Sequence, residues 1–106
     1  MAKLLENEEV LVGKARVEMQ EAMGTGEPLS FVAFVVTLPG SDEFLHKHQK
    51  AKGVTLYEWA KSRPELAHPF ARLKKAEAIA AEKESAEVGI LFETQRQYLL
   101  FTDLPK

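Results

Sequence analysis

The sequence predicts an α+β fold: an antiparallel four-stranded sheet made of two hairpins, with a two- to three-helix insert between strands 2 and 3. Three observations lead to this prediction. A glycine-rich loop joins two segments of matching alternation, an alanine- and glutamate-rich stretch has helix composition, and two apolar segments follow it around a polar turn. Because strand and helix segments are segregated along the chain, the helices are expected to cover one face of the sheet.

The first hairpin is predicted from register agreement. Residues 10–20 fit both helical and strand periodicity, and the segment that follows them favours a strand. A loop at residues 24–27 would place Met19 opposite Val32, so that small and apolar residues of both segments share one face. We therefore predict a strand at 10–20 that pairs with a second strand at 29–38.

The second predicted strand is apolar on both faces between residues 31 and 36. A strand with one face in water would alternate, so the second face needs a helix or a partner chain to cover it. An uncovered sheet face or edge is a natural contact surface. We predict a homo-oligomer whose self-association residues are Phe31, Ala33 and Val35.

Helices are predicted in the middle of the chain. Ser41 has the hydroxyl and the following acids of a helix start, and Gly53 is a typical stop. Thr55 and Glu58 have the spacing of a reciprocal helix cap. Pro69 fits the first turn of a longer, alanine-rich helix.

The closing hairpin is predicted from two segments, residues 88–94 and 97–103. A turn between them would place Phe92 opposite Leu99, and the next apolar residues then also face one another. This register gives the sheet its last two strands.

Length and composition favour one domain, residues 1–106. Hydrophobic residues make up 45% of the chain and charged residues 28%, a balance typical of globular proteins. The chain has no cysteine, which excludes disulfides and thiolate chemistry. Its longest fully apolar run has six residues, whereas a membrane span needs about 20, and Glu6 interrupts any signal-peptide core. We expect a cytoplasmic protein that does not bind membranes.

Positive charge is concentrated in the middle of the chain. Between His46 and Lys75 there are eight basic and two acidic residues, a net charge of +6, while the whole chain has a net charge of −2. In the last predicted helix the bases precede the acids, against the preference of the helix dipole, and such departures often mark function. We predict that this segment binds DNA or RNA phosphates. The predicted contact residues are Lys47, Lys50, Lys52, Lys61, Arg63, Arg72, Lys74 and Lys75.

The segment at residues 53–59 resembles the start of the recognition helix in bacterial and phage helix-turn-helix domains. The following Pro64-Glu65-Leu66 is similar to a segment of phage small terminase subunits. The likeness covers only about residues 42–75, and two residues alone separate the turn glycine from the first apolar residue. Because a turn this short could not hold two helices at the usual angle, the likeness does not assign the chain to a family.

A second hypothesis is a protein-binding adaptor or inhibitor of bacterial or phage type, acting through its sheet or its acidic ends. An acidic protein partner could also dock on the basic segment. No catalytic residue, metal site or cofactor is predicted, and we expect a protein that is not an enzyme. His46 and His48 would point apart on a helix without a third ligand, and no serine has a base beside it.

Overall fold

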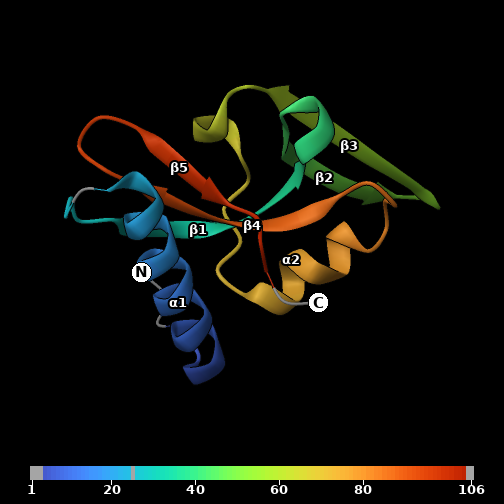
Figure 1. Cartoon of the computed structure of the whole chain (residues 1–106). Coiled ribbons are helices and arrows are strands. Elements are labelled where there is room, and N and C mark those ends of the chain that lie inside the picture. Colours follow the sequence, from blue (N-terminus) through green and yellow to red (C-terminus); the bar gives the residue numbers. More distant parts are fainter. Residues whose placement is uncertain (1–3, 25, 105–106) are drawn as a thin grey trace.

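The computed structural model describes residues 4–24 and 26–104, which form one α+β domain with two helices and a five-stranded antiparallel sheet (Figure 1). The strand order is β3-β2-β1-β4-β5. The four-stranded prediction is therefore wrong: one helix precedes the sheet and the other lies between β3 and β4. The elements are α1 (Glu6–Met23), β1 (Ser30–Leu38), η1 (Pro39–Ser41), β2 (Glu43–Ala51), β3 (Val54–Lys61), η2 (Pro64–Leu66), α2 (Leu73–Ala80), β4 (Glu87–Glu93) and β5 (Tyr98–Phe101).

The segment predicted as the first strand belongs to α1. Val12 and Ala15 are both buried, which is the three-residue spacing of a helix face, whereas Val17 is exposed although strand alternation would bury it. The helix ends at Gly24, whose φ of 68° is left-handed and whose N–H donates to the Gln20 carbonyl. The first predicted hairpin therefore does not exist, and its loop joins a helix to a strand.

Two of the predicted helices are instead β2 and β3, joined by a two-residue turn. Lys52 and Gly53 both have positive φ, 47° and 80°, as in a type I′ hairpin turn. Gly53, which was expected to stop a helix, thus serves the turn. Thr55 and Glu58 lie along β3, so they form no helix cap and the helix-turn-helix likeness falls on a strand.

The closing hairpin is confirmed in its predicted register. Phe92 pairs with Leu99, and Ile90 pairs with Phe101. The helix before it is shorter than expected, because α2 covers only Leu73–Ala80.

Two apolar clusters lie on opposite faces of the sheet. Both helices cover one face, which Figure 1 shows below the strands, and there Val12 and Ile79 pack against Phe34 and Phe92. A smaller cluster on the other face joins Val35 with Phe44 and Leu91 of the neighbouring strands, under Ala67. None of the described helices has the length and hydrophobicity to cross a membrane.

Strand β2 leaves β1 almost at once. The two strands pair only at Thr37–Phe44 and at the next position, whereas β1 pairs with β4 at seven positions. The segment after η2 fills the gap: Phe34 and Phe70 exchange two backbone hydrogen bonds of 3.0 and 2.9 Å, and the His68 N–H donates to the Leu45 carbonyl at 2.8 Å. Most of the β2–β3 hairpin therefore extends beyond the rest of the sheet (Figure 1).

A buried carboxylate joins the two helices. Glu8 of α1 is 2% exposed and accepts hydrogen bonds from the Leu73 N–H (2.8 Å), the Leu5 N–H (2.8 Å) and the Arg72 guanidinium (3.1 Å). Burial acts to raise the pKa of Glu8, but the two backbone donors and Arg72 outweigh it and lower the pKa below its ordinary value of 4.5. Glu8 thereby caps the start of α2 from α1.

The substitution Glu8→Ala should lower the free energy of unfolding at neutral pH by about 2–4 kcal/mol, because it leaves two N–H groups without an acceptor and Arg72 without its counter-ion. The neighbouring Glu9 is exposed, so Glu9→Ala should change the free energy of unfolding by no more than about 0.5 kcal/mol. Since the pKa of Glu8 is lowered in the folded state, the stability that Glu8 contributes is complete above pH 4.5, the ordinary pKa. This stability is lost as the pH falls through the folded-state pKa. Urea denaturation at pH 7 and pH 3 measures both effects, and equal losses in the two variants would contradict this assignment.

Candidate binding surface

The β2–β3 hairpin, residues 43–61 and here called the ribbon, has an outer edge along β3. The strand order leaves β3 with β2 on one side, and within residues 4–24 and 26–104 no strand pairs with its other side. Ala51 and Val54 flank a two-residue turn and so form a hydrogen-bonded pair, after which such pairs alternate along the ladder. Thr55 and Tyr57 therefore direct their backbone N–H and C=O groups to the free side.

One face of the ribbon has two exposed aliphatic side chains. Val54 and Leu56, here called the apolar pair, are each 55% exposed. The cross-strand neighbour of Leu56 is the exposed Gln49. Next along this face Lys47 Nζ lies 4.0 Å from a Glu58 carboxylate oxygen. The apolar pair is thus exposed to solvent and surrounded by charged and polar side chains.

The opposite face of the ribbon is attached to the segment after α2 through Glu82. The Tyr57 hydroxyl (2.7 Å) and His48 Nε2 (3.0 Å) both donate to one carboxylate oxygen of Glu82, and Lys50 Nζ lies 3.4 Å from the other. These donors, Tyr57 first, lower the pKa of Glu82 to about 2. In turn the hydrogen bond to Glu82 raises the pKa of Tyr57.

Aromatic side chains extend this attachment. The Tyr57 ring stacks on Trp59 at 6.2 Å and meets the His48 ring edge-on at 5.3 Å. Lys83 places its Nζ 5.9 Å from the centre of the Trp59 ring, within the range of a cation–π contact. This face of the ribbon is therefore occupied by the chain itself, whereas the face with the apolar pair is open.

The base of the ribbon is closed by two residues with left-handed backbones. Asp42 and Ser62 have φ values of 55° and 56°, a conformation that is rare outside glycine. The Ser62 N–H donates to the Asp42 carbonyl at 2.7 Å, and its hydroxyl donates to the Asp42 carboxylate at 2.6 Å. These bonds hold the two ends of the hairpin together.

The structure places the eight predicted nucleic-acid contacts in three groups rather than on one helical surface. The first group, on the ribbon, is Lys47, Lys50 and Lys52, and the second, at its base, is Lys61 and Arg63. The third group, Arg72, Lys74 and Lys75, is at the start of α2, which Figure 1 shows well away from the ribbon tip. Four of the eight form ion pairs with carboxylates, and these are Lys47 with Glu58, Lys50 with Glu82, Arg63 with Glu65, and Arg72 with Glu8. The other four, which form no ion pair with a carboxylate of the described residues, are Lys52, Lys61, Lys74 and Lys75.

The predicted self-association residues lie inside the single chain. Ala33 and Val35 are buried, the latter in the smaller cluster, and Phe31 is half-buried against the main core. These side chains do not form the open sheet face on which that prediction rested. Self-association itself stays a prediction.

The three histidines have separate roles. His46 Nδ1 lies 2.6 Å from the Leu66 carbonyl, His48 contacts Glu82, and His68 packs edge-on against Phe70 at 4.6 Å. Within the part of the chain that the structure describes, no three histidine or carboxylate side chains are grouped to hold a metal ion.

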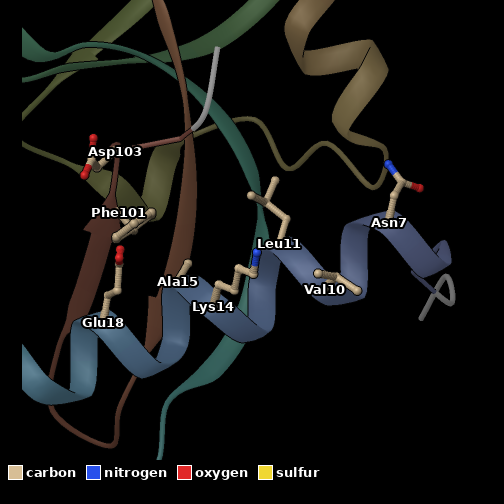
Figure 2. A pocket seen from close by; sticks show the side chains of 8 residues that line it. All are labelled: Asn7, Val10, Leu11, Lys14, Ala15, Glu18, Phe101 and Asp103. Carbon is tan, nitrogen blue, oxygen red and sulfur yellow. The ribbon is translucent and has the colours of Figure 1, made fainter.

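A separate groove of about 260 Å³ runs between α1 and β5. Leu11 and Ala15 form part of its apolar floor, and Figure 2 shows Glu18 extending from α1 towards Phe101. Asp103 lies at its far side. The charged side chains along its rim, Lys14, Glu18 and Asp103, are exposed, and among the described residues no buried side-chain nitrogen or oxygen lacks a hydrogen-bond partner, so the groove has little chemistry to select a ligand.

The apolar pair was missed because the segment was predicted to be helical. Two signals could have revealed it. Val54, Leu56 and Glu58 alternate with Thr55, Tyr57 and Trp59, the period of a strand, and Lys52-Gly53 precedes them as a hairpin turn.

Comparison of the chain with protein families, curated proteins and solved structures finds no match.

Proposed function

We propose that the protein is a non-enzymatic binding module that holds a partner protein by pairing an extended strand with the free edge of β3. The observation that carries this proposal is the unpaired eight-residue edge next to the exposed apolar pair. In strand addition the main chain provides affinity, while alternate side chains provide specificity.

The β3 edge has few of the usual protections against strand pairing, since its two charged residues, Glu58 and Lys61, lie in the second half of the strand. Edge strands are commonly short, or contain proline, a bulge or inward-pointing charges. β3 contains no proline, and the irregularity in its ladder lies on the β2 side, between Leu45 and Lys47. The other edge strand, β5, has only four residues. An edge left open beside two exposed aliphatic residues supports a role in binding.

The ribbon is also fixed before any partner arrives. Glu82 and the Trp59–Lys83 contact attach one face, and the Asp42–Ser62 bonds close the base. A preformed edge loses less conformational entropy on binding than a mobile loop does. This preorganisation leaves the partner strand as the only segment that must become ordered.

The surroundings of the edge define the partner's chemistry. Side chains at every second position of the added strand would face the apolar pair, so they are expected to be aliphatic or aromatic. Lys52 and Lys61, near the two ends of β3, favour acidic residues at the ends of that strand. The partner is therefore an extended segment with apolar residues at alternate positions and an acidic residue next to them that can pair with a lysine.

Selection from a random dodecapeptide library tests the proposal. The protein should enrich peptides of the pattern just described, and Thr55→Pro should weaken their binding at least tenfold, because proline removes an outward N–H. Proline is tolerated where a strand N–H faces solvent, so the variant should keep its fold. Thr55→Val, which keeps the N–H, is the matched control. Undiminished binding of the enriched peptides by Thr55→Pro would refute strand addition.

Nucleic-acid binding through the ribbon is the second candidate, and one observation favours it. Lys52 is at the tip of the ribbon with a φ of 47°, where glycine or asparagine is usual. Lys47 and Lys50 lie on the neighbouring strand. A two-stranded ribbon has the width of the DNA major groove, and lysines along it would meet phosphates.

Titration of labelled DNA and RNA at low salt tests this second candidate. The double variant Lys50→Ala/Lys52→Ala should weaken binding and reduce its salt dependence, because it removes phosphate contacts. Lys74→Ala/Lys75→Ala has the same change in charge on α2 and should bind like the unmodified protein. Equal losses in the two variants would indicate only a general charge effect, and no binding at low salt would exclude this candidate.

A further inference from the structure

We infer that the strand added to β3 is the β3 of a second copy of this chain, with a two-fold axis beside Leu56. This inference rests on the proposed function and names its partner. Symmetric dimers use the same surface twice, so the surface must complement itself. The β3 edge meets this requirement in one register better than in its neighbours.

The register follows from pairing rules. A two-fold axis that continues the sheet sets each residue opposite one on the same face and runs the two strands antiparallel. With Leu56 at the axis, Leu56 lies opposite the partner's Leu56 and Thr55 lies opposite the partner's Tyr57. Thr55 and Tyr57 are the residues whose N–H and C=O groups point outward, so they form the hydrogen-bonded pairs that such an edge needs.

Side chains on the open face also complement one another in this register. Val54 lies opposite the partner's Glu58 and diagonal to the partner's Leu56, which gathers the two apolar pairs into one cluster around the axis. Lys52 comes close to the partner's Glu58, and no two like charges lie directly opposite. On the other face, Thr55 and the partner's Tyr57 pair polar side chains.

Neighbouring registers are poorer. An axis beside Glu58 would place two carboxylates opposite each other, which is unfavourable. An axis beside Tyr57 would set Leu56 opposite the partner's Glu58 and separate the apolar pairs. An axis beside Thr55 would also bring the apolar pairs together, but it would pair only residues 54–56 of each β3, because the hairpin turn comes just before them. The register centred on Leu56 pairs residues 54–58 of each strand and buries both exposed aliphatic side chains without a charge conflict.

Because the chain has no cysteine, a single Leu56→Cys substitution provides a clean test. Residues opposite each other in a non-hydrogen-bonded antiparallel pair have Cα atoms about 4.5 Å apart, within the range of a disulfide. The variant should therefore cross-link into dimers under mild oxidation. Val17→Cys on α1 is the control, since Val17 is 54% exposed and Leu56 is 55% exposed. Leu56→Cys should cross-link at least tenfold faster, and adding Thr55→Pro should abolish that advantage.

Sedimentation of the unmodified chain completes the experiment, with a dimer expected at high micromolar concentration. Cross-linking of Leu56→Cys no faster than that of Val17→Cys, or a monomer at that concentration, would overturn the inference. If selected peptides still bind such a monomer through Thr55, strand addition stands and only the partner is wrong. If neither peptides nor a second copy bind, both proposals fail.

Discussion

The early separation of β2 from β1 determines how the ribbon is placed and which of its surfaces are exposed. After two paired positions, the segment with His68 and Phe70 takes over the hydrogen bonds that β2 would have made. Backbone groups of β1 stay paired, as a buried strand requires, while β2 continues away with β3. The ribbon, its free edge and the exposed apolar pair all follow from this separation.

A ribbon that leaves the sheet needs a second support, and the region of α2 provides it. Glu8 reaches the start of this helix from α1 and accepts the Leu73 N–H, while Arg72 at the N-cap makes no side-chain cap of its own. Just after the end of the helix, Glu82 holds the ribbon through Tyr57 and His48. Two carboxylates thus link α1, α2 and the ribbon, and the pKa of each is lowered by the donors it gathers.

Sequence patterns predicted the parts of this fold in which local and tertiary preferences agree. The closing hairpin has its predicted register because apolar residues of both strands face the core. The ribbon was predicted wrongly because a glycine can stop a helix as well as form a hairpin turn, and a threonine-to-glutamate spacing can cap a helix or lie along a strand. α1 was predicted wrongly because small residues at alternate positions simulate a strand.

For the candidate surface, the sequence predicted which residues are basic but not where the fold places them. The sequence identified the basic residues, but it could not tell that Lys50 pairs with Glu82, which is 32 residues away, or that Lys52 forms the turn. Such pairings depend on the tertiary fold. β1 is apolar on both faces, and the expectation that both faces need to be buried is confirmed. On the second face, Ala67 of the same chain provides part of that burial.

Amide hydrogen exchange at consecutive residues of β3 shows whether this edge is free in the single chain and pairs with another strand. Val54 and Leu56 bond to β2, whereas Thr55 and Tyr57 point outward. In dilute protein the first two amides should exchange slowly and the other two fast, and at high concentration Thr55 and Tyr57 should become protected. Protection of Thr55 and Tyr57 in dilute protein, or fast exchange at every concentration, would contradict the account.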